Sequence, residues 1–134
     1  MKVYDMTKDG WTLPDGDIEY KSGKVELELV EFLKPGENRV KGTVMAKRAV
    51  KLGANLGQKH AEAFLAKYDY WIPPEEVFRI PFPGTVWRDS DRRRRVPFIG
   101  WDVGRQFLGF GFLEDDWYSS PACRLLRPRS NVTT

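Results

Sequence analysis

The sequence has only one cysteine and one histidine among its 134 residues. The single Cys123 excludes an internal disulfide framework and suits a reducing compartment, so the cytoplasm is the expected location. The lone His60 has no second histidine or cysteine pair with which to form a zinc site, and it lacks the partners of a nucleophile–base set. We therefore expect no metal site, no cofactor and no enzymatic activity.

Long apolar runs are also missing. No stretch approaches the roughly 20 apolar residues that a membrane helix needs. Acidic Asp5 and Asp9 lie in the N-terminal segment where a signal peptide would have its apolar core. A composition with 41% hydrophobic and 31% charged residues is typical of a globular chain. The length fits a single domain over residues 1–134, and we expect no membrane partner.

Lysine disappears from the chain after Lys67. All ten lysines lie at or before this residue, whereas ten of the twelve arginines lie after it, from Arg79 onward. Lysine is a flexible, strongly hydrated charge, while arginine is a planar donor fork that stacks on rings and binds phosphate or carboxylate. This shift predicts that the second half carries the binding surface. With a net charge of only +3, any basic surface must come from local clustering.

The first half is predicted to be helical after a loop-rich arm. Turn residues recur over residues 1–23, which we expect to form that arm. Apolar residues at helical spacing over residues 25–72 predict a short helix before Pro35 and then an antiparallel helix pair between about 37 and 69. Asn55 with Gln58 three residues later resembles a capping arrangement for the second of these helices.

The second half, residues 77–129, has the alternating pattern of β-strands after the helix-breaking Pro73 and Pro74. Strands are expected at residues 77–82, 85–88, 94–101, 105–113 and 123–126. The expected fold class is α+β, with the helix pair packed on a small curved antiparallel sheet. A barrel-like closure is one form that such a sheet can take.

The fourth expected strand alternates aromatic residues with glycines. Its core face is expected to carry Leu108, Phe110 and Phe112. Gly109 and Gly111 fall on the other face, which suggests that another backbone or a ring packs closely there. By this pattern Trp101 and Phe107 lie on the glycine-bearing face, and they are the aromatic residues we expect to be exposed for binding.

Four segments resemble a group of small hypothetical bacterial proteins. They are FPGTVWRDSD from Phe82 to Asp91, RAVKLGANLGQKHAE upstream, VPFIGW in the next strand and RLLRP near the end. The resemblance covers about residues 30–128 and supports one integrated domain. It implies no function, because those proteins have no assigned activity. A glycine commonly follows the acidic turn in their pattern, whereas this chain has Arg92 there, which makes the turn more basic.

An arginine run forms the tip and entry of an expected hairpin, next to Trp87 and Arg88. Its members are Arg92, Arg93, Arg94 and Arg95. Arginine forks neutralise phosphates and aromatic faces stack bases, so the hairpin predicts a surface for RNA or single-stranded DNA. The candidate binding set also contains Arg105, Trp101 and Phe107. The alternative is that alternate arginines point to solvent while Asp89 and Asp91 pair with them locally.

Two classes of function follow from these residues. The first is a nucleic-acid-binding domain that uses the arginine hairpin and nearby rings. The second is a protein-interaction or regulatory module, because tryptophan and arginine are also enriched at protein interfaces. A remote third is a metal-dependent nuclease built on the acidic cluster 114–116 with Asp89 or Asp91. That cluster lacks a general base and any motif, so a solvated turn is favoured.

Overall fold

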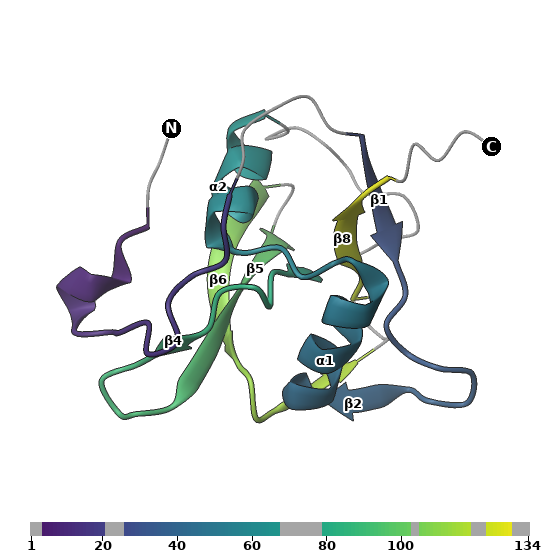
Figure 1. Cartoon of the computed structure of the whole chain (residues 1–134), viewed down its shortest axis with the longest axis horizontal. Helices are drawn as coiled ribbons and strands as arrows, with labels where there is room; N and C mark the ends of the chain where they lie inside the picture. Colours follow the sequence, from purple (N-terminus) through teal and green to yellow (C-terminus); the bar gives the residue numbers. More distant parts are fainter. Residues whose placement is uncertain (1–3, 21–25, 68–78, 103–104, 119–122, 130–134) are drawn as a thin grey trace.

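The computed structural model describes residues 4–20, 26–67, 79–102, 105–118 and 123–129. Over these residues the chain has two α-helices and several short antiparallel sheets, so the α+β class predicted from sequence is confirmed (Figure 1). The described strands form separate sheets and do not close, so the barrel-like form expected from the sequence is wrong. No described helix is long and apolar enough to span a membrane.

The largest sheet is built around β5 (Arg94–Asp102). β6 (Arg105–Phe112) pairs antiparallel with it along one side, in register from Arg95 opposite Phe112 to Asp102 opposite Arg105. The other side is shared by β3 (Arg79–Pro81) and β4 (Trp87–Arg88). The sequence predicted all four of these strands, because their alternation is regular and turns separate them.

Pro97 lies inside β5, where a missing backbone donor would normally break a central strand. Its carbonyl accepts a hydrogen bond from the Phe82 N–H at 2.8 Å, so its backbone faces the side shared by β3 and β4. β3 ends at Pro81 and β4 begins at Trp87. The proline is therefore tolerated because no strand residue opposite needs its absent N–H.

Two further strand pairs connect the N-terminal and C-terminal halves. β1 (Leu27–Val30) pairs with β8 (Leu125–Pro128), and β2 (Arg39–Lys41) pairs with β7 (Asp116–Tyr118). The short helix expected before Pro35 is wrong, because this segment is the strand β1. Its apolar residues fit both periods, and pairing with the distant β8 selects the strand. The strand β7 was not predicted.

The helix α1 (Gly42–Leu52) starts later than the residue 37 expected from sequence, because β2 occupies residues 39–41. It ends as predicted at Gly53, which has a φ of 68° and donates its N–H to carbonyls of the last turn. Buried Met45 and Ala49 pack in one cluster with Phe98 and Trp117. This cluster joins α1 to the sheet and to β7.

The helix α2 (Gln58–Lys67) begins one residue after Gly57, whose carbonyl accepts from the Ala61 N–H at 3.2 Å. The Gly57 N–H donates to Nδ1 of His60 at 3.0 Å, and the Gln58 N–H donates to Oγ1 of Thr85 at 2.7 Å. The expected Asn55 cap is therefore wrong. The side chain that accepts from the Gln58 N–H comes from a distant turn of the chain, which a local pattern does not reveal.

The two helices pack on the sheets through separate clusters. α2 lies along β5 and β6 (Figure 1), and its Ala61 and Phe64 form a second buried cluster with Ile80, Phe82, Ile99, Leu108 and Leu126. α1 contacts β2 and β7. The helices that the sequence predicted as a pair therefore contact different strands, and each helix buries its apolar stripe in a different cluster.

Candidate nucleic-acid interface

The arginine hairpin (residues 87–95) consists of β4, a tight turn and the first part of β5. The Arg92 N–H donates to the Asp89 carbonyl at 2.9 Å, and the Asp89 N–H donates to the Arg93 carbonyl at 2.8 Å. Arg92 has a φ of 65°, and among the described residues no other non-glycine residue has a positive φ. Hairpin turns of this kind usually place glycine in this left-handed position.

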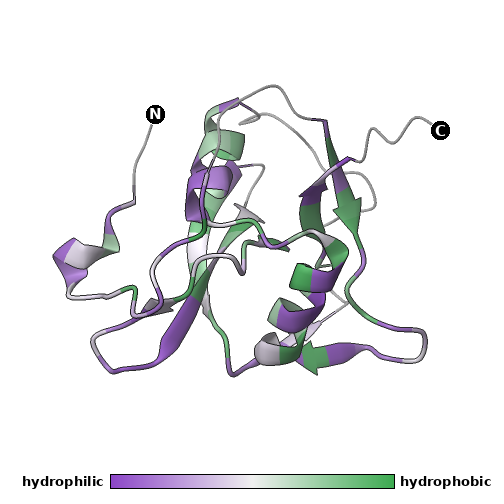
Figure 2. Cartoon of the chain, in the orientation of Figure 1, coloured by the Kyte–Doolittle hydropathy of each residue, from purple (hydrophilic) through white to green (hydrophobic). Residues whose placement is uncertain are grey.

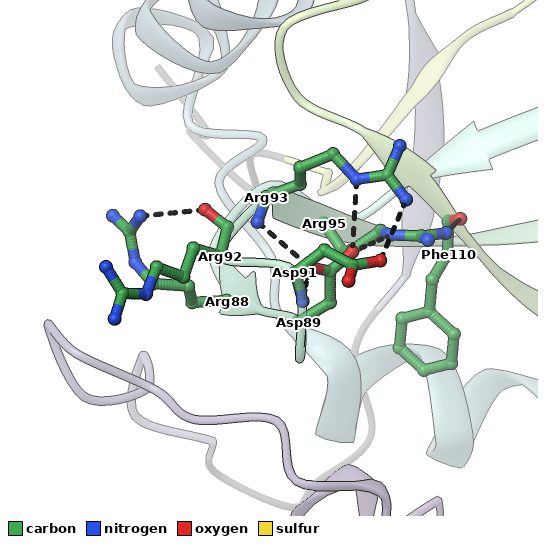
Figure 3. A network of polar contacts seen from close by, with 7 residues as sticks. All are labelled: Arg88, Asp89, Asp91, Arg92, Arg93, Arg95 and Phe110. Atoms are coloured by element: carbon green, nitrogen blue, oxygen red, sulfur yellow. Dashed lines mark hydrogen bonds and ion pairs between the residues drawn. The ribbon is translucent and has the colours of Figure 1, made fainter.

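The Asp89 carboxylate holds the turn together from inside (Figure 3). One oxygen accepts from the backbone N–H groups of Asp91 and Arg93, both at 2.9 Å, and the other accepts from Nε of Arg95 at 2.9 Å. The side chain is only 3% exposed. Burial by itself would raise the pKa of this carboxyl, but the Arg95 and backbone hydrogen bonds outweigh it and hold the pKa below its usual range.

Three of the arginines in the run have carboxylate partners. Arg93 lies 3.4 Å from Asp91, Arg94 lies 2.5 Å from Glu114, and Arg95 is held by Asp89. The guanidinium groups of Arg93 and Arg95 also lie over the Phe112 ring, at 4.4 and 3.9 Å from its centroid. Local pairing with Asp89 and Asp91, the alternative reading of the sequence, therefore holds for Arg93 and Arg95.

Arg88 and Arg92 differ from the rest of the run. Both are exposed, and the Arg88 guanidinium donates to the Arg92 carbonyl at 2.9 Å without an ion pair to any carboxylate of the described residues. The Arg92 side chain has no hydrogen bond or ion pair to any described residue, and Figure 3 shows it extending away from the turn. These two side chains therefore present uncompensated positive charge at the tip. Figure 2 shows the same region as hydrophilic, in contrast to the hydrophobic centre of the sheet.

Trp101 and Phe107 do not lie on one face, so the expectation of a shared aromatic surface is wrong. Phe107 pairs with Gly100, whereas Trp101 pairs with Gln106, and successive side chains of a strand point to opposite faces. Trp101 is partly exposed and packs against the cluster under α2. Alternation shows which residues of one strand share a face. It does not show which face of β5 lies on the same side of the sheet as a given face of β6, because that depends on the register of the hairpin.

Phe107 is on the glycine-bearing face, as predicted, and is 41% exposed. A Cβ on Gly100 would lie 2.6 Å from the tip of its ring, so the ring lies directly over that glycine. It also meets the Phe98 ring edge to face, with centroids 6.0 Å apart. Arg105, the last member of the candidate set, is exposed at the start of β6. Phe107 and Arg105 pair with the C-terminal end of β5, whereas the arginine hairpin lies at its N-terminal end.

Rings do pack over the glycines of β6, as the sequence suggested. A Cβ on Gly109 would lie 2.7 Å from the Phe98 ring, and one on Gly111 would lie 2.8 Å from the Trp117 ring. On the opposite face Leu108 is buried. Phe110 and Phe112 are only partly buried. Phe110 packs against the cluster under α2 and meets the Trp11 ring, and the Arg95 guanidinium lies over the Phe112 ring.

Two acidic residues of the cluster 114–116 pair with separate partners. Glu114 pairs with Arg94, and Asp116 lies 3.3 Å from Lys41 and 3.8 Å from Arg39. Among the described residues no group of three or more metal-ligating side chains lies together. The observed ion pairs therefore give the nuclease hypothesis no support from this cluster.

Cys123 is a buried member of the cluster under α1, in agreement with its expected role as a small apolar residue. Burial raises the pKa of its thiol to about 12, so the sulfur stays protonated and unreactive. In the basic C-terminal segment, Arg127 donates to Glu28 at 2.7 Å and to the Leu52 carbonyl at 2.8 Å. That arginine connects β8 to β1 and α1 rather than facing a partner.

The sequence analysis missed the role of the N-terminal arm (residues 4–20), which lies against the arginine hairpin (Figure 1). Thr12 and Arg88 exchange backbone hydrogen bonds of 2.9 and 2.8 Å. The Trp11 ring meets Phe110 at 5.1 Å and Trp87 at 6.3 Å between centroids, and the Arg95 guanidinium lies 5.4 Å from its centroid. A tryptophan between turn signals was the one sequence feature that could have indicated this contact.

The environment of His60 predicts that the stability of the protein decreases in mild acid. His60 is partly buried beside Tyr20, and burial lowers the pKa of its imidazole, although the nearby Asp17 carboxylate opposes this shift. The unfolded chain, with a histidine pKa of about 6.5, then binds more protons than the folded one just below that pH. We expect the free energy of unfolding to fall as the pH drops below about 6.5 and to level off below the folded pKa.

Because His60 is the only histidine, substitution isolates this effect. His60→Gln offers an acceptor to the Gly57 N–H without titrating, so its unfolding free energy, measured by urea denaturation, should lose this pH dependence between pH 5 and 7, about the range in which histidine titrates. An unchanged pH dependence in the variant would show that another group is responsible.

Comparisons of this chain with protein-family models, curated proteins and solved structures give no match. Its function is therefore inferred from the chemistry of the arginine hairpin and the residues around it.

Proposed function

We propose that this protein binds RNA or single-stranded DNA through the arginine hairpin, with Arg88 and Arg92 in contact with phosphate. The observation that carries the proposal is the left-handed backbone of Arg92. A non-glycine residue in this conformation costs about 1 kcal/mol relative to glycine. An arginine at this position therefore makes the turn less stable than a glycine would. Its exposed guanidinium has no protein partner among the described residues, so a contact with a ligand would explain why an arginine is present.

The remaining arginines support the hairpin. Asp89, Asp91 and Glu114 neutralise Arg93, Arg94 and Arg95, which leaves the charges of Arg88 and Arg92 available for an anionic partner. The Arg88 guanidinium already donates to the Arg92 backbone carbonyl, so it is held beside the residue that carries the second exposed guanidinium. Guanidinium forks bind phosphate oxygens in a bidentate manner, and two exposed forks suit the backbone of a flexible strand.

The alternative of a protein interface centred on tryptophan has less support. Of the described tryptophans, Trp87 and Trp117 are buried, and Trp11 and Trp101 are only partly exposed. Interface hot spots are usually large rings that the free protein presents to its partner. Phe107, at 41% exposure, is the described ring on the sheet best placed for a protein partner if nucleic acid does not bind.

The double variant Arg88→Gln/Arg92→Gly tests the proposal. We expect weaker binding of a fluorescent single-stranded oligonucleotide, measured by anisotropy over a range of salt concentrations. The slope of log K against log salt should decrease by about 0.7 for each lost phosphate contact. Glycine suits the backbone of position 92, so thermal unfolding should show no loss of stability from that substitution.

A charge-matched control is Lys51→Gln/Lys59→Gln, which removes two exposed cations from α1 and α2. This variant should retain the affinity and most of the salt slope of the wild type. The proposal fails if the wild type shows no affinity for RNA or single-stranded DNA at low salt, or if the lysine and arginine variants lose affinity equally.

A further inference from the structure

The N-terminal arm lies on the surface of the protein, where Tyr4 packs against the buried cluster under α2. Among the described residues 4–20, no side chain is buried. The residues beneath the arm are buried: Gln58, Glu62, Thr85 and Trp87 are all 5% exposed or less. A segment that covers buried groups while burying none of its own side chains belongs to the part of a fold that opens most easily.

Polar contacts hold much of the arm. The Tyr4 N–H donates to Glu62 at 2.7 Å, and the Tyr4 carbonyl accepts from the Gln58 side chain at 2.5 Å. The Thr85 hydroxyl donates to Asp17. Water can replace each of these hydrogen bonds when the arm detaches. Each bond therefore contributes little net free energy to holding the arm in place.

The Trp11 ring is the main apolar contact between the arm and the arginine hairpin. It occupies the Trp11 site, which we define as Trp87, Arg95 and Phe110. The Phe110 and Trp87 rings meet it edge to face, at interplanar angles of 79° and 66°. The Arg95 guanidinium lies between the faces of Trp11 and Phe112, 5.4 and 3.9 Å from their centroids. These are the groups on which unpaired nucleobases stack in single-strand-binding proteins.

The Trp11 site lies next to the proposed phosphate contacts along β4. Trp87 belongs to the site, and the next residue is Arg88, whose side chain points to the opposite face of the strand. The backbone edge of Arg88 is paired with Thr12, the residue after Trp11. The arm therefore covers the site and the outer edge of β4 together.

Resting on the proposed function, we infer that the Trp11 site is a nucleobase-stacking site and that the arm is a displaceable strap. In the free protein Trp11 occupies the place of a base. When a single strand contacts Arg88 and Arg92 through phosphate, one of its bases displaces the indole and stacks on the Arg95 guanidinium. The strand must compete with the arm, so the apparent affinity is lower than the intrinsic affinity of the open site.

The variant Trp11→Ala tests the strap. We expect it to bind a single-stranded oligonucleotide about three- to tenfold more tightly than the wild type, because the arm competes less well for the site. An oligonucleotide of abasic sites, which offers phosphates without bases, should gain nothing from the substitution. Leu13→Ala is the control within the arm, since Leu13 is also partly exposed but belongs to no ring contact of the site, and it should leave the affinity nearly unchanged.

Hydrogen exchange on the wild-type protein gives a second measurement that does not depend on a variant. The Thr12 amide, which donates to Arg88 in the closed arm, should lose protection when oligonucleotide is added. The inference is overturned if Trp11→Ala binds no more tightly than the wild type or if Thr12 stays protected at saturation. If binding then still depends on Arg88 and Arg92, the proposed function stands without the strap. If no form of the protein binds at low salt, both fail.

Discussion

Phe64→Ala is expected to lower the free energy of unfolding by about 3 to 5 kcal/mol. Phe64 is 6% exposed on α2 and packs with buried residues of β3, β5, β6 and β8. The truncation therefore removes apolar contact and leaves a cavity where elements from both halves of the chain meet. Urea denaturation followed by circular dichroism and by tryptophan fluorescence measures the loss.

The two probes should report one coincident transition, because the pairs β1–β8 and β2–β7 join the halves that the sequence suggested. Val50→Ala is the matched control, since Val50 lies on α1 and is 61% exposed. It should change stability by less than about 0.5 kcal/mol. Separate transitions, or a Phe64 variant no less stable than the Val50 variant, would contradict a single folding unit.

Asp89→Asn is expected to disorganise the arginine hairpin and to lower both thermal stability and nucleic-acid binding. The carboxylate accepts hydrogen bonds on both oxygens, from two backbone N–H groups and from Arg95. An amide has only one oxygen, so its NH₂ group would face one of these donors. The loss in melting temperature should exceed that of Arg92→Gly, which leaves this network intact.

The pH dependence of stability provides a second readout for Asp89. Its pKa is lowered in the folded state, so its stabilising contribution is complete above the unfolded value of about 3.9 and is lost as the pH falls through the folded pKa. Asp89→Asn should therefore remove part of the acid-induced loss below about pH 4. Asp91→Asn is the control, because the Asp91 side chain is 74% exposed. If the two variants have equal stability and equal pH profiles, Asp89 does not anchor the turn.

The arginine run shows how far a local pattern can be interpreted. Its position at a hairpin follows from the turn residues and the alternation on either side, and both were present in the sequence. The sequence did not show which arginines of the run have partners within the protein and which do not. Arg94 is neutralised by Glu114, which lies 20 residues away on the chain, and Arg95 packs on Phe112 of the neighbouring strand. These contacts depend on which strands become neighbours.

The aromatic residues divide in the same way. Alternation along β6 correctly placed Phe107 on the glycine face and Leu108 on the core face. It placed Trp101 incorrectly, because that residue belongs to β5 and its face depends on the register between the strands. Trp11 was not assigned a role at all, since its partners Trp87 and Phe110 come from two later strands.

By itself the sequence determined the elements whose periodicity is regular and the helix end that a glycine marks. These are α2, the C-terminal end of α1 at Gly53, and the strands β3 to β6. Only the tertiary structure decided that residues 27–30 form a strand, which arginines of the hairpin have carboxylate partners, and that the N-terminal arm covers the hairpin. The physical reason is that backbone periodicity is a local property, whereas strand pairing, ion pairing and the docking of the arm join residues far apart in the chain.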